Sequence, residues 1–170
     1  MQPTDTRLAE QFSQPGAPTA DWSASLKEIS DAMVWRVHTT RVDGRPHVTP
    51  LLTVVDGEAI YFCTGPDEQK AHNLAANPSV TLATGGDDYL HGTDYVVDGH
   101  AVPVTDEARL RELADRWVDK YTEEWRFDVV AGKFVSSGAV GGAVVFEVQP
   151  DKIYAYDRDS GGATRFSFVR

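Results

Sequence analysis

The chain has 170 residues, of which 41% are hydrophobic, and this length suits one domain that buries roughly 70% of its unfolded surface. Its 26 acidic residues outnumber its 16 basic ones, and the net charge of -10 opposes binding to nucleic acid and to anionic membranes. Cys63 is the single cysteine, which excludes an internal disulfide and a zinc site built from several cysteines and suits a reducing cytosol.

The first 21 residues are polar and contain prolines, so we expect a flexible N-terminal segment over residues 1–21 and a single domain over residues 22–170. A short helix with a cap at Ser25 should open the domain. No stretch approaches the roughly 18 apolar residues of a membrane span, and the N-terminus lacks the apolar core of a signal peptide. We therefore expect a cytoplasmic protein.

Three strands joined by tight turns should follow this helix. Residues 34–40 are rich in β-branched and aromatic side chains, and Asp43-Gly44 is a residue pair that tolerates the positive φ of a hairpin turn. Asp56-Gly57 is a second such pair, and it separates residues 48–55 from residues 59–63. The pattern predicts an antiparallel meander.

A short helix is expected between Pro66 and Pro78, because proline favours the first helical turn and cannot continue a helix. Lys70, Asn73 and Asn77 fall on one helical face at spacings of three and four residues. The other face is apolar and consists of Ala71, Leu74 and Ala75. One face can therefore pack against a sheet, and the other can hold an anion.

The second half of the chain predicts one long helix among further strands. Thr105 is the expected N-cap of this helix, and apolar residues recur at helical spacing as far as Tyr121. Residues 121–142 are compatible with a helix, a lid or a contact with a partner subunit. The expected strands are residues 79–83, 95–104, 143–148, 152–156 and 164–168. About seven antiparallel strands with few helices favour a closed β-barrel, since closure removes exposed strand edges.

Thr64, Lys70 and Asn73 supply the chemistry of a phosphate site. A phosphate needs a cation and convergent hydrogen-bond donors, and an ammonium, a hydroxyl, an amide and the free N–H groups of a helix start provide them. The alternative is that Lys70 is a solvated surface lysine and Asn73 a polar residue near a helix end. For Thr49-Pro50 the alternatives are an ordinary strand edge, where proline's missing donor does no harm, or a backbone that a flat ring can approach.

Signatures of other enzyme classes are missing. The sequence has no Gly-x-Gly-x-x-Gly, no phosphate-binding Walker loop, no Gly-x-Ser-x-Gly and no His-Glu-x-x-His. The histidines lack the paired spacing of a zinc or iron site, and we assign no metal; they are His38, His47, His72, His91 and His100. We interpret the acidic pairs Asp87-Asp88 and Glu123-Glu124 as solvated loops rather than as a catalytic acid and base.

Three segments together resemble the pyridoxamine 5'-phosphate oxidase-like superfamily of flavin- and deazaflavin-binding split β-barrels. Residues 39–51, 61–65 and 70–78 carry the resemblance and read TTRVDGRPHVTPL, YFCTG and KAHNLAANP. The end of the chain, ATRFSF at residues 163–168, is similar to that of the actinobacterial deazaflavin-dependent branch. The resemblance covers nearly all of the chain from Trp22 onward and implies a homodimer of mainly β split barrels with cofactors at the subunit interface.

The resemblance also implies which residues bind the cofactor. The strand formed by His47, Val48, Thr49, Pro50 and Leu51 would run along the ring system. Thr64, Lys70 and Asn73 would hold the phosphate. Catalytic residues are not assigned, because a flavin or deazaflavin carries its own redox chemistry.

Two cofactors fit this resemblance, and we favour coenzyme F-420, a deazaflavin, over FMN. The second strand lacks the arginines and lysines of authentic pyridoxamine-phosphate oxidases, which argues against oxidation of that substrate. The acidic tail of F-420 would need a local basic groove, for which the candidates are Arg36, Arg41, Arg45 and Lys70.

The predicted function is that of an oxidoreductase which transfers a hydride to or from a small, electron-poor organic molecule. We expect this substrate near the aromatic residues of the segment 121–134, which includes Trp125 and Phe127. The alternatives are an FMN-dependent reductase or oxidase, a non-catalytic flavin or deazaflavin carrier, and a haem-binding protein with a histidine ligand.

Overall fold

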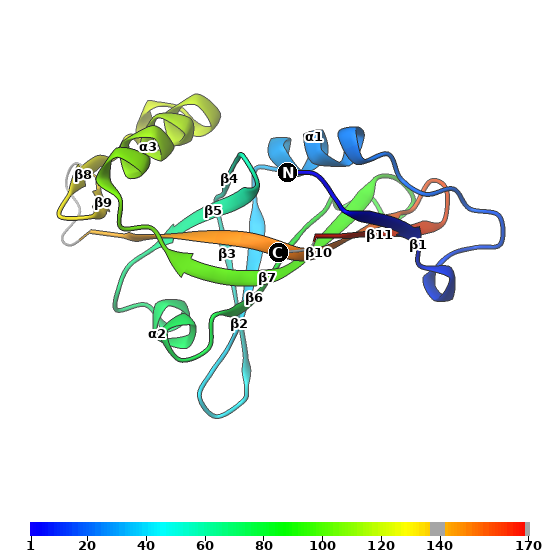
Figure 1. Ribbon diagram of the computed structural model, residues 1–170, viewed down its shortest axis with the longest axis horizontal. Coiled ribbons are helices and arrows are strands. Elements are labelled where there is room, and N and C mark those ends of the chain that lie inside the picture. Colours follow the sequence, from blue (N-terminus) through cyan, green and yellow to red (C-terminus); the bar gives the residue numbers. More distant parts are fainter. Residues whose placement is uncertain (137–141, 169–170) are drawn as a thin grey trace.

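A computed structural model describes residues 1–136 and 142–168 of the chain (Figure 1). Its helices are α1 (Trp22–Asp31), α2 (Gln69–Ala76) and α3 (Glu107–Tyr121), with 3-10 turns η1 (Glu10–Phe12) and η2 (Glu123–Trp125). Its strands are β1 (Asp5–Leu8), β2 (Trp35–Thr40), β3 (Pro46–Leu51), β4 (Val54–Asp56), β5 (Ala59–Thr64), β6 (Ser79–Thr84), β7 (Thr93–Pro103), β8 (Asp128–Val130), β9 (Lys133–Val135), β10 (Val144–Asp157) and β11 (Gly162–Ser167). None of the helices in the described ranges is long and apolar enough to cross a membrane.

The long strand β10 organises the main sheet. In the described part of the chain nine strands join in the order β1-β11-β10-β7-β6-β2-β3, with β5 pairing with β10 and β4 with β5. The first part of β10 lies between β5 and β7, and its last part lies between β7 and β11. The register against β7 shifts between Pro150 and Lys152, as in a β-bulge. The sheet therefore divides around β10, and the mainly β split-barrel fold that the sequence predicts is confirmed.

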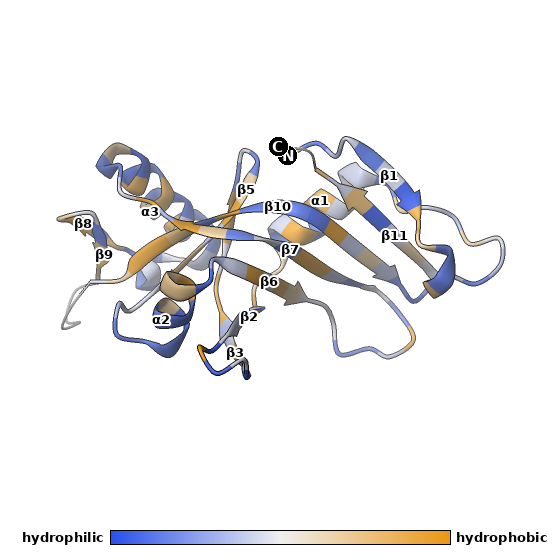
Figure 2. Cartoon of the chain, turned by 60° about the horizontal axis from the view of Figure 1, so that its bottom comes forward, coloured by the Kyte–Doolittle hydropathy of each residue, from blue (hydrophilic) through white to orange (hydrophobic). Residues whose placement is uncertain are grey.

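Two hydrophobic cores lie on opposite sides of the β5–β10 pair. The first fills the barrel with large buried side chains, among them Trp35, Phe62 and Phe166. The second packs α3 against the sheet through residues such as Trp117 and Val145. Buried and half-buried residues alternate along the middle of β7, and Figure 2 shows that the neighbouring strand β10 carries both hydrophobic and hydrophilic residues. This alternation is what directs one face of each strand into the core.

The hairpin turns predicted from the sequence are present. Gly44 and Gly57 have φ values of 83° and 58°, which explains why a glycine follows aspartate at each turn. The predicted strand over residues 48–55 is wrong as one element, because the chain leaves the sheet at residues 52–53. Its first part, β3, pairs only with β2, and its last part, β4, pairs with β5. This separation makes β3 a free edge of the sheet.

All three predicted helix starts need correction. Asp21, rather than Ser25, caps α1 by accepting from the N–H of Ala24 at 2.9 Å. Asp106, rather than Thr105, caps α3 in the same way. In both cases a carboxylate lies three residues before an N–H that has no partner within the helix. The third helix, α2, begins at Gln69 instead of Pro66, so only its end at Asn77 matches the prediction.

The N-terminal segment, predicted to be flexible, contains a strand that the sequence did not reveal. Residues of β1 pair antiparallel with β11, and the N–H of Ala9 donates to the carbonyl of Ala163 at 2.7 Å. The amino group of Met1 donates to the carbonyl of Gly57 at 2.8 Å. Part of the segment 1–21 is therefore an edge of the main sheet.

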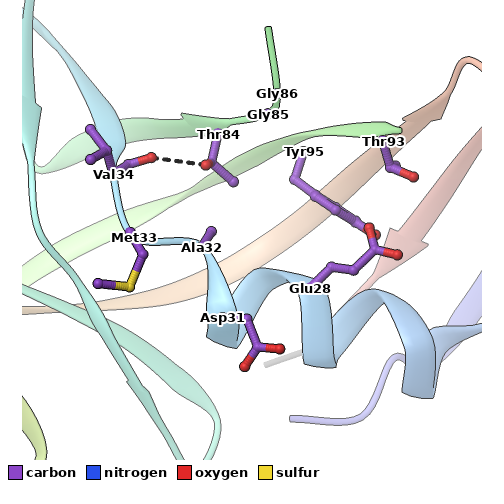
Figure 3. Close-up of a pocket in the computed structure, with 10 residues that line it drawn as sticks. All are labelled: Glu28, Asp31, Ala32, Met33, Val34, Thr84, Gly85, Gly86, Thr93 and Tyr95. Atoms are coloured by element: carbon purple, nitrogen blue, oxygen red, sulfur yellow. Dashed lines mark hydrogen bonds between the residues drawn. The ribbon is translucent and has the colours of Figure 1, made fainter. Parts of the chain in front are cut away.

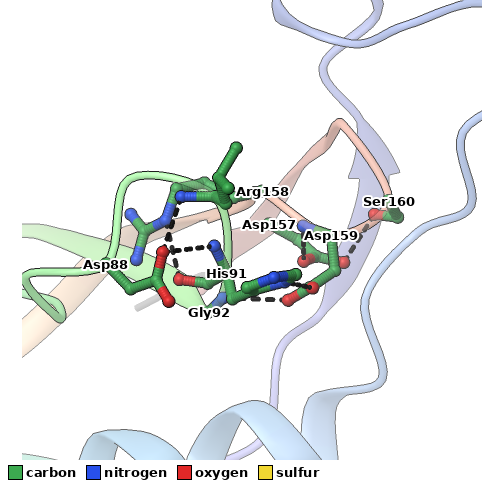
Figure 4. A network of polar contacts seen from close by, with 8 residues as sticks. Asp88, His91, Gly92, Asp157, Arg158, Asp159 and Ser160 are labelled. Atoms are coloured by element: carbon green, nitrogen blue, oxygen red, sulfur yellow. Dashed lines mark hydrogen bonds and ion pairs between the residues drawn. The ribbon is translucent and has the colours of Figure 1, made fainter.

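A polar network closes the end of the molecule opposite α3 (Figures 1 and 4). Asp159, in the turn between β10 and β11, accepts from His91 at 2.6 Å and from the N–H of Gly92 at 2.8 Å. Next to it, Arg158 forms an ion pair with Asp94 and donates to the carbonyl of His91. These bonds fasten the loop between β6 and β7 to the β10–β11 turn.

Candidate cofactor site

The five predicted ring-binding residues of β3 lie on two faces. Across the β2–β3 ladder, Trp35, Val37 and Thr39 pair with Leu51, Thr49 and His47. Because the β2 residues of these pairs are buried, His47, Thr49 and Leu51 are on the core side of the hairpin. Val48 and Pro50 alternate with them and face the other way, so one ring cannot contact all five side chains.

The prolines of β3 suit its position at the sheet edge. Pro46 and Pro50 are separated by four residues, so their nitrogens point to the same side of the strand. An edge strand tolerates proline where the missing N–H would face outward. This part of the backbone therefore has few donors for a further strand, and it is accessible to a ligand.

A chain of hydrogen bonds joins α2 to the β2–β3 hairpin. Asn73 donates from Nδ2 to the Oγ1 of Thr39 at 2.8 Å, and Thr39 lies 3.5 Å from the Nδ1 of His47. Gln69 donates to the Oδ1 of Asn73 and accepts from Arg41 at 2.7 Å. Asn73 is 1% exposed, and these bonds fix α2 beside β2, while its role at a phosphate stays a prediction.

A carboxylate lies where the sequence predicts an anion. Lys70 is only 6% exposed and forms an ion pair with Glu68, the N-cap residue of α2. The Oε1 of Glu68 also accepts from the N–H of Gly65 at 2.8 Å. Thr64, which is buried, directly precedes Gly65. Thr64 is therefore next to the backbone N–H that binds the same carboxylate as Lys70, and the alternative that Lys70 is a solvated surface lysine is excluded.

The ionisation of two groups in this region follows from their neighbours. Burial by itself would raise the pKa of the Glu68 carboxyl, but the hydrogen bonds from Lys70 and Gly65 hold this pKa below its ordinary value. Burial lowers the pKa of His47, and the positive charges of Arg41 and Lys70 lower it further. Glu68 is therefore anionic and His47 neutral at pH 7.

The geometry fits a flavin-type cofactor at two points. The Oγ1 of Thr49 is buried and has no hydrogen-bond partner among the described residues, which leaves a polar group for the edge of a ring. Lys70 provides a buried cation for a phosphate, and only one carboxylate pairs with it in the described ranges. The sequence pointed to both residues, but it gave no signal for the roles of Glu68, Thr39 and Gln69.

The aromatic segment after α3 packs within the chain. Phe127 stacks on Phe134 at a centroid distance of 4.8 Å, and Trp117 of α3 meets Phe134 edge to face at 5.5 Å. The β8–β9 hairpin thus covers α3, and Trp125 is the partly exposed member at 40%. Residues 137–141, part of the segment 121–142 for which a helix, a lid or a subunit contact is expected, lie outside the described residues.

A cavity of about 420 Å³ lies away from these residues, between α1 and the facing ends of β6 and β7 (Figure 3). Its walls include Glu28 and Met33, and the hydroxyl of Tyr95 donates to Glu28 at 2.8 Å. None of the predicted cofactor-binding residues lines it. Within the ranges that the structure describes, no group of three His, Cys, Asp or Glu side chains could hold a metal ion.

The fold defines a class of protein, the split barrels of the pyridoxamine-phosphate-oxidase-like type. The family model of pyridoxamine 5'-phosphate oxidase matches residues 24–157, well over half of the chain. The chain therefore belongs to the pyridoxamine 5'-phosphate oxidase family. No curated protein matches its sequence at a significant level.

Solved structures of related fold bind different groups. The haem storage protein HutZ from Vibrio cholerae is 16% identical with a TM-score of 0.63, over 81% of this chain and 97% of that one. An FAD-binding protein from Mesorhizobium loti is 20% identical with a TM-score of 0.59, and the match covers 89% of this chain and 99% of that protein. An F-420 reductase is 23% identical with a TM-score of 0.52, and the match covers 75% of this chain and 93% of that protein. Because all three sequence identities are below 25%, the similarity is evidence for the fold alone.

Proposed function

We propose that the protein is an oxidoreductase that binds a flavin-type cofactor between β3 and the start of α2. It transfers a hydride to or from a small, electron-poor organic molecule. The observation that carries this proposal is the buried cation Lys70 in the first turn of α2, at the end of the short connection that starts after Thr64. Membership of the pyridoxamine 5'-phosphate oxidase family, whose model spans this region, supports the proposal.

Each part of the site has a task. Lys70, the N–H of Gly65 and the hydroxyl of Thr64 hold the phosphate, and the free hydroxyl of Thr49 contacts the ring. The neutral imidazole of His47 lies on the same side of β3 as Thr49 and offers one hydrogen-bond donor. The bound cofactor supplies the hydride chemistry, and the chain orients it and limits access of water.

We favour F-420 over FMN as the cofactor. Arg41 and Lys70 lie on the α2 side of the hairpin and can attract the acidic tail of F-420. Arg45 extends this positive region, although Asp43 pairs with it at 2.7 Å. Arg36, a fourth candidate, alternates with Val37 and faces the other side of β2, so it belongs to a different surface.

We further propose that the protein is a cytoplasmic homodimer with the cofactor at the subunit interface. The outer face of the sheet offers the contact surface, and it borders the proposed cofactor site at the edge strand β3, next to β2. A row of exposed and half-buried side chains crosses five strands at paired positions, namely Arg36, Ala83, Val96, Tyr154 and Arg165. The Nε of Arg165 is buried without a partner among the described residues, and a second subunit could satisfy it.

Steady-state turnover tests the enzymatic proposal against the carrier alternative. Purified protein is mixed with reduced F-420 or reduced FMN and a panel of quinones and enones, and cofactor oxidation is followed by absorbance under nitrogen. We expect catalytic oxidation that depends on the acceptor. Stoichiometric binding without turnover of any acceptor would favour a carrier, and a Soret band with haem but no flavin binding would favour a haem protein.

A further inference from the structure

We propose that Glu68 is a built-in counter-anion of the phosphate site and makes it select a phosphodiester over a phosphomonoester. Cofactors whose phosphate is esterified on both sides, as in F-420, would then bind in preference to FMN. This inference rests on the proposed function and adds the class of phosphate that the site accepts.

The contacts of Glu68 are those that a phosphate would need. Its two carboxylate oxygens separately accept from the N–H of Gly65 and from the ammonium of Lys70. Lys70 is 6% exposed and Glu68 is its one ion-pair partner in the described ranges, so any ligand anion that reaches Lys70 must displace or share this carboxylate. The carboxylate thus occupies the anion position in the absence of a ligand.

Glu68 can leave that position at little cost to the fold. Its side chain is 52% exposed, and although it is the N-cap residue of α2 it makes no capping hydrogen bond. Gly65 has no side chain in the way: a Cβ there would lie 3.2 Å from the Oε1 of Glu68. The carboxylate can therefore swing toward solvent while the backbone of α2 stays in place.

The charges of the region decide which phosphate fits. Lys70 and Arg41 are the cations on this side of the hairpin that count toward the net charge, because Asp43 offsets Arg45 and His47 is neutral. Glu68 is tethered to the site even after displacement, so the net charge available to a ligand is about one positive unit. A phosphodiester carries one negative charge, whereas a monoester carries about -1.5 to -2 at pH 7. The second charge of a monoester is repelled by Glu68.

The test compares FMN with its phosphate methyl ester, two ligands that share one ring and differ in phosphate charge. Affinities for the wild type, Glu68→Gln and Asp67→Asn are measured by fluorescence titration, with riboflavin as the ligand without phosphate. Gln keeps the shape of Glu68, and Asp67 is the adjacent exposed carboxylate that controls for a general change of charge. Thermal unfolding checks that each variant folds.

We expect the wild type to bind the ester more tightly than FMN, and Glu68→Gln to raise FMN affinity at least about tenfold more than ester affinity. Asp67→Asn should leave the ratio of the two affinities nearly unchanged. In the wild type alone, the preference for the ester should shrink near pH 5, where FMN loses its second charge. An unchanged ratio in Glu68→Gln, or no ester preference at pH 7.5, overturns the inference while the proposed function stands. Failure of F-420 and of all these flavins to bind overturns the proposed function together with it.

Discussion

At the scale of single residues, Thr49 shows how an unsatisfied group can indicate a ligand. A buried hydroxyl without a hydrogen bond costs stability, commonly about 1–3 kcal/mol. The neighbouring side chains Val37 and Leu51 are apolar and have no hydrogen-bonding group for this hydroxyl. We therefore interpret its presence as a cost that cofactor binding offsets.

Thr49→Val should make the free protein more stable, by up to about 1 kcal/mol, because the isosteric methyl group loses no hydrogen bond. The same change should weaken cofactor binding. Urea unfolding and fluorescence titration measure the two effects. Thr84→Val is the control: its hydroxyl donates to the carbonyl of Val34 at 2.9 Å, so this variant should be destabilised with unchanged cofactor affinity. A destabilised Thr49→Val protein with normal binding would contradict the assigned role.

Contacts between residues close together in the sequence could be predicted, whereas contacts between distant segments could not. Thr64 and Lys70 are six residues apart, at the two ends of the short connection from β5 into α2, so a local motif is enough to group them. Asn73 was assigned to the same site, but its amide bonds to Thr39, which lies 34 positions earlier in the chain. Such contacts depend on how α2 docks on β2, and no local pattern encodes that docking.

At the scale of elements, two adjacent residues anchor the end of α3. The hydroxyl of Tyr121 accepts from the N–H of Thr53 and lies within hydrogen-bond distance of the carbonyls of Thr53 and Met33. The ammonium of Lys120 donates to the carbonyls of Ala32 and Thr53, each at 2.9 Å. These bonds hold the two loops at which β2 begins and β3 ends.

Tyr121→Phe should destabilise the fold by about 1–3 kcal/mol, because the buried N–H of Thr53 loses its acceptor. Tyr89→Phe is the matched control, since Tyr89 is 83% exposed, and it should change stability by less than about 0.5 kcal/mol. Urea unfolding measures both. Equal stabilities of the two variants would show that Tyr121 does not anchor the loops.

Lys120 predicts a pH dependence of stability. Burial lowers its pKa from 10.5 to about 8, only slightly opposed by Asp31. Between pH 8 and about 10.4 the unfolded chain holds the proton and the folded chain does not, so the contribution of Lys120 to the free energy of unfolding rises with pH. Below pH 8 both states are protonated and the contribution is constant.

The free energies of unfolding of the wild type and of Lys120→Met, each measured at pH 7 and 9.5, test whether the contribution of Lys120 rises with pH. The difference between wild type and variant should shift in favour of the wild type at the higher pH. Tyrosines of raised pKa are common to both proteins and cancel in the difference. A difference that is the same at both pH values would mean that Lys120 has its ordinary pKa in the fold.

The elements themselves were largely predictable, and their ends were not. β-branched runs and Asp-Gly turns located β2, β5 and the intervening hairpins. The break at residues 52–53 was missed, because Leu-Leu-Thr-Val-Val continues a strand pattern while the chain there changes from one neighbour to another. Strand β1 was missed because its polar sequence gains order only by pairing with β11.

At the scale of the whole molecule, the uncovered sheet face is the proposed subunit contact. Val96 lies at the centre of the row that crosses the sheet, between Ala83 and Tyr154. Permanent dimers bury about 2,000 Å² or more, and a carboxylate at the centre of such an interface would be unpaired.

Val96→Asp should therefore convert a dimer into a monomer, as measured by light scattering after size-exclusion chromatography. Val42→Asp is the control, because Val42 is 88% exposed at the tip of the β2–β3 hairpin. It should remain dimeric. A wild-type protein that is monomeric at micromolar concentration would contradict the proposed dimer.

The sequence predicted the mainly β split barrel through its resemblance to a family and its strand count, although closure of the sheet depends on pairings between distant segments. The strand β10 is an example: two predicted strands form one long element because the bulge at Pro150 lets both halves pair with β7. In the sequence, Pro150 suggested a boundary between two strands, whereas in the structure a β-bulge lets the proline lie within one continuous strand.

The most direct measurement is equilibrium binding of F-420 and of FMN to the wild type, Lys70→Gln and Lys27→Gln. Lys27 is an exposed helical lysine paired with Asp31, so its replacement removes the same charge away from the site. The wild type and Lys27→Gln should bind at least one of the two cofactors, one molecule per chain, and Lys70→Gln should bind it roughly 10- to 100-fold more weakly. Equal binding by the two variants, or no binding of either cofactor to the wild type, would contradict a cofactor phosphate held by Lys70.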